Sequence, residues 1–229
     1  MRVAGIDEAG RGCAIGPLVI AGALFDEETI PTLRDIGVKD SKQLSAKKRT
    51  SLADVIRELA LDIQVFEVQP WVIDHVVFRS KPLRRLNYLE TMVMAKIVRE
   101  LEPDVVHMDP PDVDNHRCAR QIQSVVKREL DIICEPKADS KYLSTGAASI
   151  IAKVTRDLRI AELREKHGDI GSGYSSDWKT QEYLADYFSK TKGCPSFIRA
   201  SWATVQRHLN PVKQMTLESS RGPSHRDQE

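Results

Sequence analysis

Two apolar runs separated by a short, glycine-rich connection open the chain and limit the folds that it can adopt. Residues 2–7 and 17–25 are apolar enough to form buried strands, and the connection between them includes the sequence GCAIGP. A connection this tight predicts a hairpin, in which the two strands pair in antiparallel fashion. The sheet therefore begins with an antiparallel pair.

The rest of the chain alternates between strand patterns and helix patterns. Residues 61–68 alternate between apolar and polar, and short apolar runs cover 104–109 and 132–138, so three more strands are predicted. Helices are predicted from Ser45, from Pro70, and over 87–101, 115–130, 146–167, 178–189 and 201–209. The order favours an α/β fold with a mixed central sheet, flanking helices and a C-terminal helical extension.

Length and composition indicate one globular domain with a polar tail. The chain has 229 residues, of which 41% are hydrophobic and 29% charged, and its formal net charge is +1. We expect residues 1–210 to form a single domain, and residues 211–229 to be disordered because they carry no packing pattern. A net charge this close to zero confines any attraction for nucleic acid to local clusters of basic residues.

The cysteines and the apolar segments indicate the compartment. The chain has four cysteines, with neither a CxxC pair nor the spacing of a zinc site. No apolar segment approaches the ~20 residues of a membrane span, and the first residues lack the pattern of a signal peptide. We expect a cytoplasmic protein with reduced cysteines and no membrane contact.

Acidic residues stand at the ends of three predicted strands. Asp7 and Glu8 close the first strand, Asp109 closes the fourth and Asp139 closes the fifth. Because carboxyl ends of strands meet at one edge of an α/β sheet, we expect these four carboxylates to converge. Their mutual repulsion favours a site for hard divalent cations, Mg²⁺ or Mn²⁺. The alternative is that each acid is an ordinary turn or capping residue.

Small residues near the acids indicate a ligand that approaches the main chain. Gly10 and Gly12 expose the backbone after the first strand, although they lack the third glycine of a dinucleotide-binding motif. The segment GAASI, residues 146–150, begins a helix whose N-terminus can receive a phosphate. Adjacent strand residues point to opposite faces, so Asp7 and Glu8 should reach one site only where the strand bends.

Five ordered motifs resemble ribonuclease HII in its archaeal form. They are GIDEAGRG at residues 5–12, DSK at 40–42, HMDPPD at 107–112, ADSKY with AASIIAKVTRD within 138–157, and GSGYSSD from Gly171. The resemblance extends from about residue 2 to residue 209. It implies an RNase H-like catalytic domain, cleavage of the RNA strand in RNA/DNA hybrids, and incision at single ribonucleotides embedded in duplex DNA.

The resemblance assigns the metal-binding carboxylates. Asp7, Glu8, Asp109 and Asp139 match the four acids that hold two divalent ions in the family. The strand end reads MDPPD, which makes Asp112 a competitor for the third position. We favour Asp109 because it ends an apolar strand, whereas Asp112 follows two prolines.

The resemblance also assigns residues to the substrate. It implies that one segment reads ribose 2′-hydroxyls through its main chain, namely Gly10, Arg11 and Gly12. Tyr142 matches the tyrosine that packs under the sugar at the RNA–DNA junction, and Lys42 matches a phosphate contact. Asp157 is expected to support the site without binding the metal.

The implied chemistry is hydrolysis assisted by two Mg²⁺ or Mn²⁺ ions, giving 5′-phosphate and 3′-hydroxyl ends. His107 and His116 flank the site in sequence, and we interpret both as structural histidines. One alternative is another RNase H-like nuclease of the resolvase or transposase type. A second is a nucleic-acid-binding module without catalysis, which retention of all four acids disfavours.

The expected partners are RNA/DNA hybrids and DNA containing ribonucleotides. Residues 214–217, QMTL, resemble the start of a sliding-clamp-binding peptide, but the two aromatic residues expected after them are missing. A plain polar tail is the favoured interpretation. We expect the protein to act as a monomer.

Overall fold

The computed structural model describes residues 1–38, 45–79, 86–112 and 114–210. A five-stranded sheet runs through its centre in the order β3-β2-β1-β4-β5. The strands are β1 (Arg2–Ala9), β2 (Leu18–Asp26), β3 (Asp62–Val68), β4 (Val105–Met108) and β5 (Asp131–Cys134). Strand β2 is antiparallel to β1 and β3, whereas β4 is parallel to β1 and β5. The predicted mixed sheet and its antiparallel opening are confirmed.

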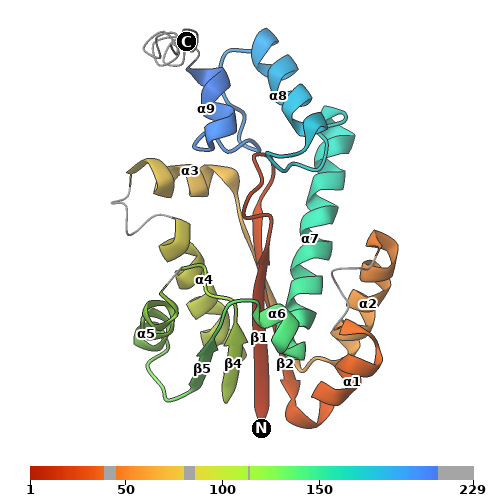
Figure 1. The fold of residues 1–229 in the computed structure, drawn as a ribbon, viewed down its shortest axis with the longest axis vertical. Helices are drawn as coiled ribbons and strands as arrows, with labels where there is room; N and C mark the ends of the chain where they lie inside the picture. Colours follow the sequence, from red (N-terminus) through yellow and green to blue (C-terminus); the bar gives the residue numbers. More distant parts are fainter. Residues whose placement is uncertain (39–44, 80–85, 113, 211–229) are drawn as a thin grey trace, which may run out of the picture.

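Helices cover both faces of this sheet (Figure 1). They are α1 (Ile30–Asp35), α2 (Ala46–Leu59), α3 (Pro70–Arg79), α4 (Leu86–Leu101), α5 (Asn115–Val126), α6 (Ala138–Lys141), α7 (Leu143–His167), α8 (Trp178–Lys190) and α9 (Ala203–Leu209), with a 3-10 turn at Glu27–Thr29. Helices α4 and α5 lie on one face, and α1, α2 and α7 lie on the other.

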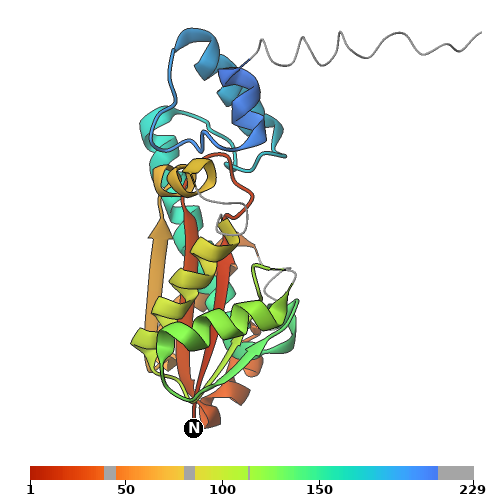
Figure 2. The ribbon, with the colours of Figure 1, turned by 90° about the vertical axis from the view of Figure 1, so that its left-hand side faces the viewer.

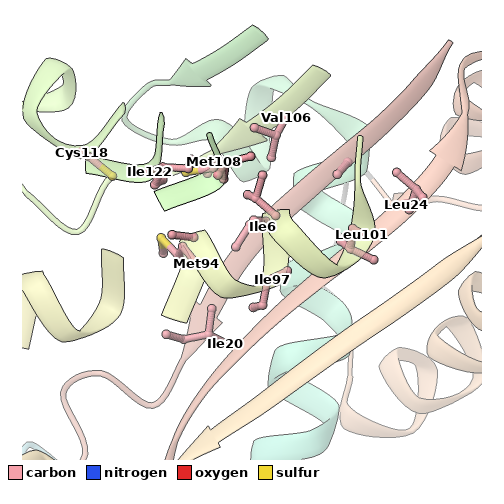
Figure 3. Packing of buried hydrophobic residues seen from close by; sticks show 14 of the residues in the cluster. Ile6, Ile20, Leu24, Met94, Ile97, Leu101, Val106, Met108, Cys118 and Ile122 are labelled. Atoms are coloured by element: carbon pink, nitrogen blue, oxygen red, sulfur yellow. The ribbon is translucent and has the colours of Figure 1, made fainter. Parts of the chain in front are cut away.

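Each face of the sheet has its own apolar core. Ile6 and Ile20 pack with Met94 and Ile97 of α4 on one side (Figure 3). On the other side, alternate residues of β1 and β2 pack against α2 and α7. The alternation follows from the pleat, which sends successive side chains to opposite faces.

The small residues at the start of α7 allow unusually close packing on β1. A Cβ atom built on Gly5 would lie 2.0 Å from the main-chain carbon of Ser144, a separation that no side chain can adopt. Glycine at this position therefore lets the helix run directly along the strand. Farther along α7, Arg156 packs against Gly10, so β1 and α7 advance side by side.

The C-terminal helices form a third cluster beyond the carboxyl end of β1 (Figures 1 and 2). Ile15 from the β1–β2 connection packs there with Ile170, Leu184 and Ile198. Two isolated bridges, Cys13 with Tyr174 and Ile15 with Ile198, join the connection to the extension. The predicted helical extension is confirmed, and it is built onto the connection between the first two strands.

Several predicted boundaries are wrong. Strand β1 continues to Ala9, so Asp7 and Glu8 lie inside it, and β5 ends at Cys134 rather than at residue 138. Helix α7 begins three residues before the predicted start. Helix α5 ends at Val126 because Lys127 adopts a left-handed conformation with φ of 57°.

Two features named in the sequence analysis lie outside the described residues. Lys42 and the tail at 211–229, which includes QMTL, are not among them. In the described ranges, every helix is too short or too polar to cross a membrane.

Candidate active site

Asp7 and Glu8 occupy neighbouring positions on β1 and face different helical layers. The Asp7 carboxylate interacts electrostatically with Asp139 and with Lys153 of α7. The Glu8 carboxylate instead interacts with Glu90 of α4 as well as with Asp7. These different partners agree with side chains on opposite faces of the strand, and the two carboxylates still interact electrostatically.

Burial dominates the electrostatics of Asp7. It raises the pKa of this carboxyl group to about 6, and the nearby Asp139 carboxylate adds to the rise. The Ser149 hydroxyl and the Lys153 ammonium group oppose it. An acid with this pKa, held in a buried position, is stabilised as a carboxylate by any cation that enters the site.

Glu8 has an unfavourable electrostatic environment for a charged carboxylate. Burial raises its pKa well above the ordinary value, and the carboxylates of Asp7, Glu90 and Asp109 raise it further, while Arg11 opposes them. Its Oε2 atom is buried and finds no hydrogen-bond partner among the described residues. A buried carboxylate oxygen without a partner is costly in a folded protein, and a bound cation would remove that cost.

Asp109 and Asp139 come from the loops that follow β4 and β5. Asp109 comes directly after β4, and its Oδ2 atom accepts a hydrogen bond of 2.9 Å from the Lys137 amide. Asp139 lies on the single turn α6, where the Ser140 hydroxyl donates to it at 3.2 Å. The prediction that Asp139 ends a strand is wrong, because the chain leaves the sheet at Cys134 and turns through a left-handed Lys137 before reaching it.

Asp112, the competitor for the third position, has a separate partner. Its carboxylate accepts a hydrogen bond of 2.7 Å from the Nε atom of Arg117, and a second, shorter contact from the same guanidinium. The Asp114 amide also donates to it at 3.3 Å. Asp112 therefore interacts with the start of α5. Asp109, by contrast, is close enough to Glu8 for its carboxylate to raise the pKa of Glu8.

The four carboxylates suit a hard divalent cation, although their side chains do not surround a single position. All four candidate ligands are carboxylates, which Mg²⁺ and Mn²⁺ prefer, and Glu8 offers an unpartnered oxygen. As the side chains stand in the described part of the chain, no three acids, histidines or cysteines are grouped tightly enough to hold an ion. The site is thus a set of mutually repelling acids within electrostatic reach of one another.

The glycine loop, residues 10–12, continues directly from β1. Gly10 has φ of 83°, a conformation that favours glycine, and a Cβ atom there would lie 2.8 Å from the Pro17 carbonyl oxygen. The guanidinium of Arg199 donates to the carbonyl oxygens of Gly10 at 2.7 Å and Arg11 at 2.9 Å. The loop is therefore held by a residue near the end of the described chain.

The Arg11 side chain turns toward α4 and away from the Arg199 contact. Its Nε atom donates to Glu90 at 3.0 Å, and its Nη2 atom donates to the Asn87 side chain at 2.7 Å and to the Pro111 carbonyl at 3.2 Å. Burial raises the pKa of Glu90 to about 7, while Arg11 opposes the rise. Sequence reasoning missed Glu90, whose position in an amphipathic helix gives no sign that it is fully buried.

Tyr174 lies beside the glycine loop and was not singled out in the sequence. Its backbone bridges Cys13, and a Cβ atom on Gly12 would lie 3.9 Å from its ring. The Arg156 guanidinium stacks over that ring at 4.4 Å, and the side chain is 37% exposed. The motif GSGYSSD contains this residue and is the signal in the sequence that marks it.

Tyr142 lies away from the glycine loop, at the start of α7. Its ring stacks on His107 with centroids 3.9 Å apart, and its hydroxyl donates to Glu135 at 3.2 Å. It directly precedes α7, whereas Arg156 of the same helix contacts Gly10. At about 1.5 Å of rise per residue, roughly 20 Å of helix separates the two levels. The structure does not bring Tyr142 to the glycine loop, so its assigned role at the sugar stays a prediction that its position disfavours.

The remaining candidates have structural partners. Asp157 pairs with Arg156 at 3.0 Å and with Arg49 at 3.3 Å, so it holds the arginine that packs on Gly10 and Tyr174. The Nδ1 atom of His107 lies 3.2 Å from the Ser144 hydroxyl, and burial lowers the pKa of the imidazole. These positions agree with a supporting role for Asp157 and a structural one for His107.

The chain is similar to known proteins over most of its length. The family model described as Ribonuclease HII matches residues 4–205. Ribonuclease HII of Pyrococcus furiosus is 42% identical over 222 residues, which cover 95% of this chain and 97% of that protein. The crystal structure of ribonuclease H2 from Pyrococcus horikoshii matches with a TM-score of 0.86 and 42% identity, covering 93% of this chain and 100% of that one.

A further solved structure, the complex of PCNA with RNase HII from Archaeoglobus fulgidus, matches with a TM-score of 0.80 and 40% identity. It covers 88% of this chain and 95% of the matched chain. The mixed sheet and its flanking helices define a nuclease of the ribonuclease H class. The chain belongs to the ribonuclease HII family. It is therefore a hydrolase with endonuclease activity on RNA/DNA hybrids, in a family that depends on divalent metal ions.

Proposed function

We propose that this protein incises duplex DNA on the 5′ side of a single embedded ribonucleotide, in addition to cleaving the RNA strand of hybrids. The products would carry 5′-phosphate and 3′-hydroxyl ends, and the roles would be ribonucleotide removal and RNA primer processing. The observation that carries this proposal is the firmly held glycine loop next to the buried acids of β1. A fixed main chain beside a cation site can select one nucleotide and present its phosphate.

Four carboxylates would hold two Mg²⁺ or Mn²⁺ ions, namely Asp7, Glu8, Asp109 and Asp139. Bound ions would activate a water molecule and stabilise the leaving 3′ oxygen. The protein contributes the fixed backbone of β1 and the Lys137 amide that orients Asp109. It also buries Asp7 and Glu8, so that a bound cation would stabilise their charged forms. Asp157 would support the site through Arg156.

The glycine loop would distinguish RNA from DNA, because the 2′-hydroxyl is the group that differs between them. Gly10, Arg11 and Gly12 would make this contact through their main chain, which passes from the buried Gly10 to the exposed Gly12. Tyr174 is the exposed aromatic residue at this loop, so we place the sugar-packing tyrosine there rather than at Tyr142. Lys42 remains a proposed phosphate contact outside the described residues.

Family membership disfavours the two alternatives. A resolvase or transposase-type nuclease would act on DNA and would have no use for a loop that reads a ribose. A non-catalytic module would gain nothing from buried acids close to phosphates. We also propose a cytoplasmic, monomeric protein, with residues 1–210 as the catalytic domain.

A sliding-clamp contact is a separate and weaker proposal. The Archaeoglobus fulgidus relative was solved in complex with PCNA. In this chain, the segment that would make the contact is the tail with QMTL, at residues 214–217. Its missing aromatic residues argue for a contact weaker than that of a complete motif.

The direct test uses a labelled DNA duplex with one ribonucleotide, a matched all-DNA duplex and an RNA/DNA hybrid. We expect incision 5′ of the ribonucleotide and cleavage of the hybrid with Mg²⁺ or Mn²⁺, no cleavage of the DNA duplex, and no activity in EDTA. Cleavage of the hybrid alone would refute the proposed incision at single ribonucleotides and would limit the protein to RNA/DNA hybrids. Cleavage of the all-DNA duplex would contradict the proposed selectivity.

A further inference from the structure

Arg199 is a charged residue buried without any exposure, and it lies in the segment that leads into α9. Burying a guanidinium is costly unless its N–H groups find acceptors. Here the Nε atom donates to the Gly16 carbonyl at 3.1 Å, Nη1 to the Arg11 carbonyl at 2.9 Å, and Nη2 to the Gly10 carbonyl at 2.7 Å. All three bonds end on the connection between β1 and β2.

These bonds fix two consecutive peptide planes of the glycine loop. A trans peptide directs its C=O and N–H groups in opposite directions. With the Gly10 and Arg11 carbonyls turned toward Arg199, the N–H groups of Arg11 and Gly12 are turned the other way. Arg199 therefore sets which main-chain groups the loop can offer to a ligand.

The segment that carries Arg199 is itself anchored from two directions. The Arg199 amide donates to the Ala14 carbonyl at 2.8 Å, and the guanidinium stacks on the Trp202 ring at 4.7 Å. The Asp74 carboxylate of α3 accepts from the amides of Ala200 and Ser201, both at 2.8 Å. Helix α3 thus holds the segment in place while Arg199 holds the loop.

We infer that Arg199 is a positioning residue for recognition of the ribonucleotide, and that the C-terminal extension completes the substrate site through it. The inference rests on the proposed function, because it concerns how the glycine loop selects its nucleotide. Lysine cannot reproduce the effect, since an ammonium group is a point charge and lacks the planar fork that reaches several carbonyls at once.

The test compares affinities in a cleavage-deficient Asp109→Asn parent with Mg²⁺ present. Fluorescence anisotropy gives the Kd values for a duplex with one ribonucleotide and for the same duplex in all-DNA form. We expect Arg199→Lys to lower the preference for the ribonucleotide at least about threefold, as the loss of a hydrogen bond does. In the otherwise wild-type enzyme, kcat/KM on the embedded ribonucleotide should fall about 10- to 100-fold, as sub-ångström to ångström misplacement does.

The matched control is Arg207→Lys, the same substitution on the exposed side of α9, which should leave both the preference and kcat/KM unchanged. A merely structural role would lower the folded fraction and both affinities equally, so a folded Arg199→Lys protein with an unchanged preference overturns the inference. If Arg199→Lys does not fold, the same ratio of Kd values is measured for Asp74→Asn, which loosens the segment that carries Arg199. A fall in the preference for the ribonucleotide, smaller than the one expected for Arg199→Lys, supports the inference, and an unchanged preference overturns it. If the Asp109→Asn parent has no preference, selection depends on the acids and the inference is overturned, whereas failure of the wild-type enzyme to incise at the ribonucleotide would contradict the proposed function itself.

Discussion

The acids of the sheet and the glycine loop are neighbours along β1, yet they are organised in opposite ways. The acids are held by the strands and turns that carry them. They repel one another, burial raises the pKa of both Asp7 and Glu8, and one oxygen of Glu8 has no hydrogen-bond partner among the described residues. The loop has little side-chain bulk of its own and is held by Arg156 and Arg199, which lie far away in the sequence. The comparison suggests a division of labour, in which the acids perform the chemistry and the loop selects the nucleotide.

The largest effect is expected at the acids. Asp109→Asn or Asp139→Asn should lower kcat by about a thousandfold or more, because a catalytic metal contributes several kcal/mol of transition-state stabilisation. Amide for carboxylate keeps the shape, so the metal-free Tm should stay level or rise as repulsion is relieved. Single-turnover cleavage and thermal unfolding in EDTA measure both. Near-wild-type cleavage by both variants in Mg²⁺ would remove these residues from the ligand set.

The next effect separates the two tyrosines. Tyr174→Ala should slow incision at a single ribonucleotide about 5- to 150-fold, because base or sugar packing on an aromatic ring is worth about 1–3 kcal/mol. Tyr142→Ala should have a much smaller effect, since its ring packs on His107. The comparison is kcat/KM for both variants on the same duplex. A larger loss at Tyr142 would restore the role that the sequence resemblance gave it.

The closeness of the four acids could be predicted because each lies near in sequence to the strand that positions it, whereas their role as metal ligands stays a proposal. Asp7 shows how far this goes: an apolar run before it and glycines after it place it on a buried strand, although β1 continues past it to Ala9. Asp139 shows the limit, because α6 carries it and nothing in the preceding residues signals where β5 ends. The support of the glycine loop could not be predicted, because Arg199 and Glu90 reach it only through tertiary packing.

The stability of the metal-free protein should depend on pH through Glu90. Its pKa is about 7 in the folded state, against an ordinary value of 4.5, because it is buried. Between these values the folded protein binds more protons than the unfolded chain, so stability falls as pH rises from about 5 to 8. Glu90→Gln should reduce that fall by on the order of 1–3 kcal/mol. Unfolding in urea with EDTA at several pH values measures it, and an unchanged pH dependence would refute the assignment.

The smallest effect on catalysis is expected at Asp112. Asp112→Asn weakens the ion pair with Arg117 at the start of α5 and should cost about 1 kcal/mol of stability or less, while kcat stays within about twofold. The same two assays as for Asp109 apply. A loss of turnover comparable with that of Asp109→Asn would make Asp112 the third ligand.

The most direct test of the division of labour is the binding preference of an enzyme that cannot cleave. The Kd of Asp139→Asn is measured in Mg²⁺ for a duplex with one ribonucleotide and for the identical all-DNA duplex. The account predicts that the variant still prefers the ribonucleotide by a few-fold to about tenfold, because a hydrogen bond to the 2′-hydroxyl is worth about 1 kcal/mol and does not need this acid. Equal affinity for the two duplexes would show that selection depends on the acids and would contradict the account.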